Sequence, residues 1–371
     1  MQGFDWEILT IAVLTAVGCA LPGNYLVLRR MSLMSDAISH AILLGIVLAF
    51  FVAGSLDSPL LMLGAAATGL LTVALVELLH RTQLVKEDTA VALVFPSLFS
   101  AGVLLIALYA GNIHLDVDAV LLGELAFAPF DRVSVAGVDL GPRALWISGA
   151  IAALNGILVR LYYKELELAT FDAALAASLG FAPALLHYGL MATVSITAVG
   201  AFDAVGSVLV VALMIVPAAC AYLLTQRLHA MILLSLLLAV TGAITGYAMA
   251  RALDASIAGS MATTLGLEFL LVYLLAPQRG LIAAMLQRAG RRREFAQAML
   301  LIHLLNHEGT EAEAEECRLA GLENHLGWSA AQARRVAAEL ERQADIQTYA
   351  GLMQLTALGR ERARHKFVEL L

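Results

Sequence analysis

Long apolar runs separated by short polar connections make up most of this chain. Each run holds about 20 residues, enough for a helix to cross the hydrocarbon core of a bilayer. Charged residues are 14% of the 371 residues and hydrophobic residues 60%, whereas soluble domains average roughly 25% charged residues. The pattern excludes an ordinary soluble domain and predicts a mainly α-helical, polytopic membrane protein with about nine spans. The predicted spans are Ile8–Leu28, a run from between Met31 and His40 to Val52, Leu60–Leu79, Thr89–Tyr109, Ala144–Tyr163, Pro183–Ala201, Val205–Leu224, Met231–Ala250 and Ile257–Leu275.

Basic residues are distributed unevenly between the connections. If the spans alternate from an outside N-terminus, most Lys and Arg fall on one side, which should be the cytoplasm. These residues are Arg29, Arg30, Arg81, Lys86, Lys164, Arg227, Arg279, Arg288 and Arg291–Arg293. Arg132, Arg143 and Arg251 fall on the other side. We therefore predict that the N-terminus is outside and the C-terminal region is cytoplasmic.

The C-terminal region carries much more charge than the rest of the chain. This shift marks a domain boundary, so we predict a membrane domain at residues 1–281 and a small cytoplasmic domain at residues 282–371. Within the second domain, the patterns predict helices at Phe295–Asn306, Glu311–Ala320, Ser329–Gln343 and Thr356–Leu370, and strand-like segments around a glycine in Asp345–Leu355. Ser329 is the expected N-cap of the third helix.

Asp36 and His40 stand four residues apart at the start of the second apolar run. In a helix this spacing puts both side chains on one face, one turn apart. Carboxylate oxygen and imidazole nitrogen suit Mn, Fe and Zn, and ionisable groups inside a membrane usually mark a pathway or site. The alternative is an ordinary helix N-terminus, with Ser35 and Asp36 as caps and His40 as an interface residue. The spacing alone leaves both interpretations open.

Other acidic and polar residues form weaker candidates. The predicted external loop from Gly111 to Pro142 contains Asn112, His114, Asp116, Asp118, Glu124 and Asp131. These residues either concentrate cations at an outer vestibule or belong to an ordinary solvated loop, the interpretation that we favour. Asp203 precedes the seventh span. Glu268, inside the ninth, either lines a polar pathway or is protonated or paired within the bundle.

A short helix is predicted between the fifth and sixth spans. Ala173–Leu179 favours a helix, Asp172 is a suitable N-cap, and Gly180 is a suitable residue just past its end. The helix is too short to cross a bilayer, so it either links two spans or docks another subunit. Pro217, inside the seventh span, should kink that span or open a gap in its backbone hydrogen bonds.

Several motifs occur in order along the membrane domain. They are Val27–Ser32, Ser35–Ala41, Leu179–Gly180, Gly206–Val210, Ile215–Ala218 and Ala276–Leu281. Together they resemble the permease subunits of bacterial ABC importers for manganese, zinc and iron, which work with cluster A-I solute-binding proteins. The resemblance covers about Phe4–Leu281. It implies that Asp36 and His40 coordinate metal in the translocation path, and that the short cytoplasmic helix docks onto the ATPase.

The resemblance also implies a set of partners in a bacterial cytoplasmic (inner) membrane. Two copies of the permease, or two related permeases, would form the path at their interface, and an extracytoplasmic metal-binding protein would deliver the ion. No Gly-x-x-x-x-Gly-Lys-Ser/Thr phosphate loop occurs in the sequence, so a separate ABC ATPase subunit would hydrolyse ATP. The chain would then be a transport subunit rather than an enzyme. It would hold no tight cofactor, and Mn, Zn or Fe would be its substrate.

The charged C-terminal domain departs from the usual length of this family. Its order of helices and hairpin, with Leu355–Gly359 ending the hairpin, resembles the winged helix-turn-helix of diphtheria-toxin-repressor-type metalloregulators. Lys and Arg nearly balance Asp and Glu from Arg291 onward, apart from the Arg334–Arg335 pair. Because DNA-binding surfaces are basic, DNA is a poor partner and we favour a regulatory or assembly module. The histidines of this domain either bind a metal as a sensor or are ordinary residues: His303, His307, His325 and His365.

Two other functions compete with the permease. A stand-alone secondary metal transporter or channel would work without an ATPase, but the predicted docking helix and the scarcity of acidic residues in the spans argue against it. A membrane-anchored, metal-responsive regulator would use the bundle mainly as a sensor. Weak DNA affinity, together with loss of metal uptake on deletion of the spans, would count against that function.

Overall fold

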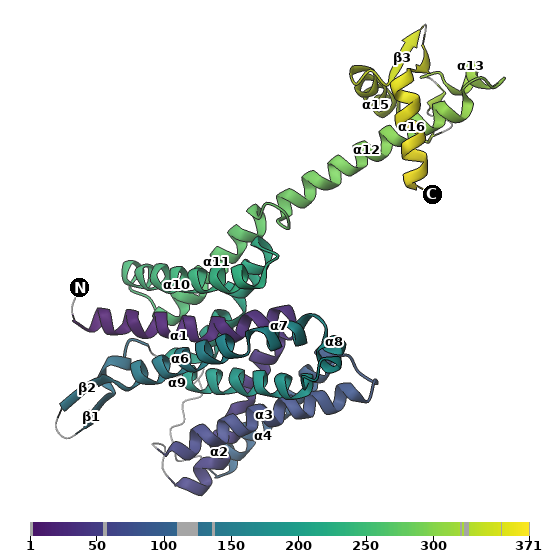
Figure 1. The fold of residues 1–371 in the computed structure, drawn as a ribbon. Helices are drawn as coiled ribbons and strands as arrows, with labels where there is room; N and C mark the ends of the chain where they lie inside the picture. The colour runs from purple at the N-terminus through teal and green to yellow at the C-terminus, as the bar shows by residue number, and fades with distance from the viewer. Residues whose placement is uncertain are drawn as a thin grey trace. The chain divides into compact units, whose positions relative to one another are not determined.

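The computed structural model describes residues 3–54, 58–109, 125–135, 138–319, 321–322, 326–349 and 351–370. The chain divides into two compact units, Met1–Gly280 and Leu281–Leu371. Figure 1 shows the first unit in purple to green and the second in green to yellow. The first unit is a bundle of long helices, and the second combines helices with a small hairpin.

Nine helical segments in the described residues are long and apolar enough to cross a membrane. They lie at the predicted positions, so the prediction of about nine spans is confirmed. The helices that supply them are α1 (Gly3–Leu28), α2 (Ser32–Ala53), α3 (Pro59–Arg81), α4 (Glu87–Tyr109), α6 (Arg143–Leu161), α9 (Pro183–Leu224), α10 (Leu228–Leu253) and α11 (Ile257–Leu275).

The long helix α9 supplies two of the nine spans, which are joined by a sharp turn at Gly206. Gly206 has φ 77° and ψ 164°, a backbone conformation that is essentially restricted to glycine. Contacts along α9 show that the chain reverses its direction relative to α1. Before the turn, Pro183 shares a cavity with Met31, and Asn155 donates hydrogen bonds to both Thr197 and the Gly18 carbonyl. After the turn, Met214 lies against Gly23 and Ala221 packs near Leu28, so the chain returns toward the C-terminal end of α1. The break therefore lies at Gly206, whereas the helix continues through Pro217.

Helix α1 packs against α6, α9 and α10 in the membrane unit. Pro22 and Gly23 lie inside this helix without ending it. A Cβ on Gly23 would fall 1.9 Å from the carbonyl oxygen of Met214, so glycine permits the close approach of α1 and α9. The next residue, Asn24, is fully buried and donates hydrogen bonds of 2.7 Å to the Ala20 carbonyl and the Ser235 hydroxyl. Small and polar residues thus join α1 to α9 and α10.

The two ends of the bundle carry different charged contacts. At the end where α1 begins, Arg132 on β1 (Arg132–Val135) pairs with Glu7 and with Asp139 on β2 (Val138–Pro142). The Gly141 amide and the Arg132 guanidinium hold the pKa of the Asp139 carboxyl below its usual range. Arg251 also lies at this end, where it pairs with Asp5.

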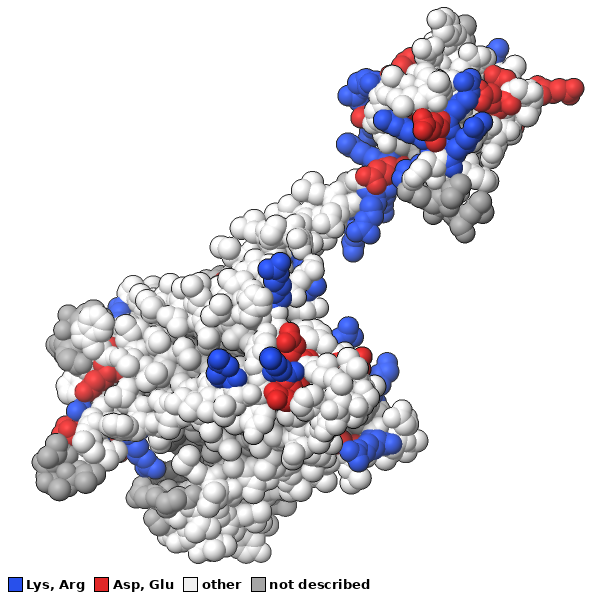
Figure 2. Space-filling model, viewed as in Figure 1, with Lys and Arg blue, Asp and Glu red and all other residues white. Residues whose placement is uncertain are grey.

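The opposite end carries the larger group of predicted cations. Arg29 there donates to the Thr170 hydroxyl at 3.1 Å, and Arg279 donates to the Tyr222 carbonyl at 3.2 Å. The visible surface between the ends is mostly uncharged (Figure 2). Arg29 and Arg279 thus lie at the opposite end of the bundle from Arg132 and Arg251.

Two short helices, α7 (Tyr163–Phe171) and α8 (Ala173–Ser178), follow α6. The caps of α8 are as predicted: Asp172 accepts a hydrogen bond of 2.8 Å from the Leu175 amide, and Gly180 has φ 88°. Sequence analysis missed α7, whose charged residues follow directly on the fifth span. Helix α7 is held to the bundle by buried Leu166.

The C-terminal unit contains α12 (Leu281–His307), α13 (Glu313–Glu316), α15 (Ala330–Arg342), the hairpin β3 (Ile346–Tyr349) and β4 (Leu352–Leu355), and α16 (Ala357–Leu370). The Ser329 cap and the hairpin around Gly351 agree with prediction. Two predictions were wrong. Helix α12 begins well before Phe295, because the residues leading to the Arg291–Arg293 run are good helix formers. Helix α13 ends at Glu316 because the following segment bonds to β4 instead.

Candidate functional site

The start of α2 positions the predicted site. Only Arg29–Met31 separate α1 from α2, and Arg30 has φ 61°, so the connection is tight. The N-cap of α2 is Met31, which makes no side-chain capping bond. The Ser35 hydroxyl instead donates to the Ser32 carbonyl at 3.0 Å, and Asp36 lies in the second turn. Capping by Ser35 and Asp36 is therefore wrong as an explanation of this stretch.

Asp36 and His40 do contact each other. The His40 Nε2 atom lies 3.4 Å from the Asp36 Oδ1 atom. The His40 ring also packs against two aromatic rings of α4, with centroid distances of 5.9 Å to Phe95 and 6.0 Å to Phe99. At 1.5 Å per residue, Asp36 lies about 6 Å and His40 about 12 Å along α2 from Ser32. The pair thus lies in the half of the span nearer to the Arg29 end.

In a single chain the pair is incomplete as a metal site. The side chains are 42% exposed at Asp36 and 29% exposed at His40. Together they offer two ligand atoms, whereas transition metals in proteins take about four to six. A charged pair on a surface that faces lipid is also costly. The geometry therefore suits a site that another surface must cover and complete.

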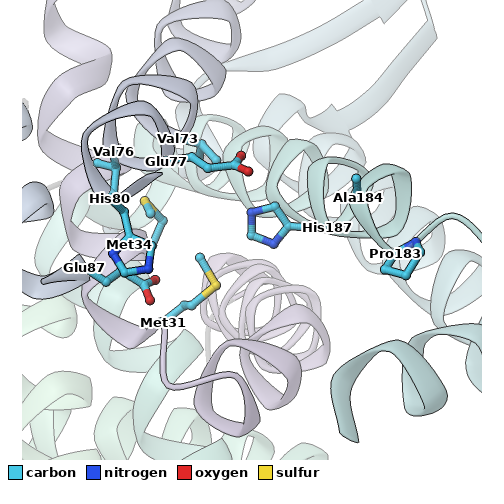
Figure 3. Close-up of a pocket in the computed structure, with 10 residues that line it drawn as sticks. All are labelled: Met31, Met34, Val73, Val76, Glu77, His80, Glu87, Pro183, Ala184 and His187. Carbon is cyan, nitrogen blue, oxygen red and sulfur yellow. The ribbon is translucent and has the colours of Figure 1, made fainter. Parts of the chain in front are cut away.

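A cavity of about 320 Å³ lies beside the first turn of α2 (Figure 3). It is lined from four helices, and Met31 and Met34 come from α2 and the residue before it. Figure 3 shows Glu77 facing His187 on one side, and His80 lying beside Glu87 on the other. These residues provide nitrogen, oxygen and sulfur atoms to the wall of the cavity. The cavity lies at the Arg29 end of the bundle.

The polar lining of this cavity was not predicted from the sequence. His80 and Glu87 flank the connection between the third and fourth spans, where they read as ordinary interfacial residues. His187 is at least 100 positions further along the chain than either residue, so no local pattern joins it to them. The sequence feature that could have indicated the cavity is the pair His80 and Glu87, which lie at adjacent ends of two consecutive spans.

The other candidates have different outcomes. Glu268 accepts a hydrogen bond of 3.0 Å from the Thr241 hydroxyl, so it has a partner within the α10–α11 pair. Asp131 lies 4.0 Å from Arg143. The remaining loop candidates lie outside the described residues: Asn112, His114, Asp116, Asp118 and Glu124. The side chain of Asp203 is also outside the description.

The connection that contains α8 exposes a set of large apolar side chains. Leu175 lies on α8 itself, with Phe171 before it and Leu179 after it. These side chains are 45%, 63% and 61% exposed respectively. They lie at the Arg29 end of the bundle, since α7 carries the Thr170 partner of Arg29. An apolar surface outside the spans is a typical contact area for another protein.

Two of the four C-terminal histidines come together. His303 and His307 lie on the last turns of α12, and Glu316 lies beside them. His325 lies outside the described residues, and His365 is on α16. Burial, followed by the nearby glutamate charges, raises the pKa of the neighbouring Cys317 thiol to about 11.

The sequence matches the model of one protein family, the ABC 3 transport family, over residues 4–276. This match spans the whole membrane unit up to the end of α11. The chain belongs to the ABC 3 transport family. Family membership confirms the resemblance found in the membrane domain and establishes a multi-pass membrane protein.

Two curated relatives show how much of the chain the family shares. The chain is 48% identical over 353 residues to the zinc transport system membrane protein TroD of Treponema pallidum, covering 95% of this chain and 96% of TroD. It is 46% identical over 295 residues to the manganese transport system membrane protein MntD of Bacillus subtilis, covering 80% of this chain and all of MntD. The match to TroD therefore extends into the C-terminal unit.

A solved structure supports the fold of the membrane unit. PsaBC from Streptococcus pneumoniae, solved in complex with a Fab, contains a chain that matches with a TM-score of 0.63 and 28% identity. The match covers 75% of this ABC 3 chain and 93% of the PsaBC chain.

Proposed function

We propose that this ABC 3 chain is the membrane permease subunit of an ATP-driven importer for a divalent transition metal. The observation that carries the proposal is the Asp36–His40 pair, held 3.4 Å apart inside a span of a chain from this family. TroD is named for zinc transport and MntD for manganese transport. Both ions, and Fe²⁺, accept mixed oxygen and nitrogen ligands.

The translocation path lies at the interface with a second permease copy or a paralogue. The partial exposure of Asp36 and His40 supports this arrangement, because a second α2 helix would cover the pair and double its ligands. The completed site holds the ion weakly, since an ion that binds too tightly does not leave. The cavity around His80 and Glu87 offers the ion its next contacts toward the Arg29 end.

The ABC ATPase docks at the Arg29 end, on the surface around α8. Exposed Phe171, Leu175 and Leu179 support this contact. The excess of predicted basic residues at the same end supports a cytoplasmic position for it by the positive-inside rule. The N-terminus of α1 and the β1–β2 hairpin then face outward, where an extracytoplasmic metal-binding protein delivers the ion. ATP-driven movement of α8 alternates the access of the Asp36–His40 site between the two sides.

The C-terminal unit is a winged-helix-like module with a regulatory or assembly role. The order α12, α15, hairpin and α16 supports this fold assignment. Acidic and basic residues are mixed on its visible face (Figure 2), which argues against a DNA surface.

The test of the proposed function is metal uptake in cells that lack their own importers. We expect the chain to give no uptake alone, and Mn²⁺ or Zn²⁺ accumulation when it is expressed with its ATPase and any paired permease. An ATPase variant that cannot hydrolyse ATP is the control and should abolish uptake. Uptake by the chain alone, driven by an ion gradient, would instead support a secondary transporter.

A further inference from the structure

A second cluster of metal-ligating side chains lies in the C-terminal unit, apart from the membrane path. His303, His307 and Glu316 each offer one ligand atom, and these atoms all lie within 4.8 Å of one another. Among the residues that the structure describes, these three side chains form a group that is close enough together to hold a metal ion. We propose that His303, His307 and Glu316 form a binding site for a divalent transition metal.

The fold brings these three residues together by two local devices. His303 and His307 are four residues apart at the end of α12, so they share one face, and their ring centroids are 4.7 Å apart. The chain then turns at Gly309, which has φ 75°, and the Gly309 amide donates to the Glu313 carboxylate at 2.8 Å. This turn returns α13 along α12 and places Glu316 beside His303.

The chemistry of the cluster suits a metal of the first transition row. Two imidazole nitrogens and one carboxylate oxygen are a common set for Zn²⁺, Mn²⁺, Fe²⁺ and Co²⁺. The His303 Nε2 atom lies 3.8 Å from the Glu316 Oε2 atom, and their side chains are 11% and 21% exposed. Three protein ligands leave room for water or one further ligand. Binding at His303 Nε2 exchanges its 3.1 Å contact with the Glu316 carbonyl for a bond to the ion.

The site is connected to the hairpin through the residues that follow Glu316. The backbone carbonyl of Cys317 accepts a hydrogen bond of 3.0 Å from the Met353 amide, and the Leu319 amide donates to the Gly351 carbonyl. The backbone of Arg318 forms an isolated antiparallel β-bridge with that of Leu352 on β4. An ion that holds Glu316 to α12 therefore also steadies the strand-like segment that lies along β4. Metal binding at the cluster should therefore change the stability of the β3–β4 hairpin.

The test is titration of Co²⁺ into the purified full-length chain in detergent, followed by visible absorption. Wild-type protein should give the spectrum of a nitrogen- and oxygen-ligated ion. In a chain whose Asp36 and His40 are both replaced by alanine, His307→Ala should abolish it, and Glu316→Gln should weaken binding by at least about 10-fold. Glu315→Gln is the matched control, because Glu315 is exposed on α13 and outside the cluster. It should bind like wild type.

Two further variants separate this site from the transport path. Asp36→Ala and His40→Ala together remove the proposed path ligands, so the Co²⁺ spectrum that remains reports the C-terminal cluster. Unchanged Co²⁺ binding when a folded His307→Ala variant is made in that background would overturn the proposal. If the variants fail to fold, hydrogen exchange on wild-type protein decides: Zn²⁺ should slow exchange at residues 316–319 and 351–353, and no change there would contradict the site.

Discussion

At the scale of single residues, the sequence predicts contacts between residues that are close along the chain, but not contacts between residues that are far apart along it. The i,i+4 spacing correctly put Asp36 and His40 in contact, and the Asp172 cap was read from its local sequence. By contrast, the Asn24–Ser235 hydrogen bond joins residues 211 positions apart. No local pattern specifies such a pair, because it depends on how α1 packs against α10. The polar cavity around His80 was missed for the same reason.

The Asn24–Ser235 bond predicts energetic coupling between two helices. Asn24→Ala and Ser235→Ala should each lower the free energy of unfolding in detergent. The double variant should lose less than the sum of the single losses, by about 0.5–2 kcal/mol, because the shared hydrogen bond can be lost only once. The measurement is a double-mutant cycle on purified protein. Strictly additive losses would mean that the bond does not contribute.

At the scale of elements, hydropathy located the spans but not the way they are joined. The nine segments match the predicted runs because each must be apolar over the thickness of a bilayer. The reversal inside α9 depends on one backbone conformation at Gly206, which hydropathy does not report. Likewise, α13 was predicted too long, because helix propensity does not include the competing bonds from the segment after it to β4. Tertiary contacts thus overrode local preference at the end of α13, whereas one glycine conformation redirected the chain in α9.

The turn at Gly206 predicts a strong dependence on glycine. Gly206→Ala forces a side chain into a conformation that costs about 1–3 kcal/mol, so its melting temperature in detergent should fall. Gly266→Ala is the matched control, since a Cβ there meets no atom within 4 Å and α11 is a regular helix. That variant should melt at or slightly above the wild-type temperature. Equal melting of both variants would argue against a strained turn.

At the scale of the whole molecule, the change in composition predicts a boundary after residue 281, and the structure divides into compact units at Gly280. Family membership supplies the broad class of the bundle, a subunit of a transport system. The ligands of the path are a finer matter, because we propose that the path lies between two permeases. Asp36 and His40 are partly exposed in the single chain, and the central claim is that they bind the transported metal.

The most direct test of that claim is metal accumulation in cells that express the complete importer with Asp36→Ala or His40→Ala. Loss of either ligand should reduce Mn²⁺ or Zn²⁺ uptake by roughly 10-fold or more at equal permease abundance. Asp88→Ala is the control, because Asp88 is an exposed carboxylate in the first turn of α4 and lies outside both the pair and the cavity. It should transport like wild type. Normal uptake in both the Asp36 and His40 variants would contradict the proposed path.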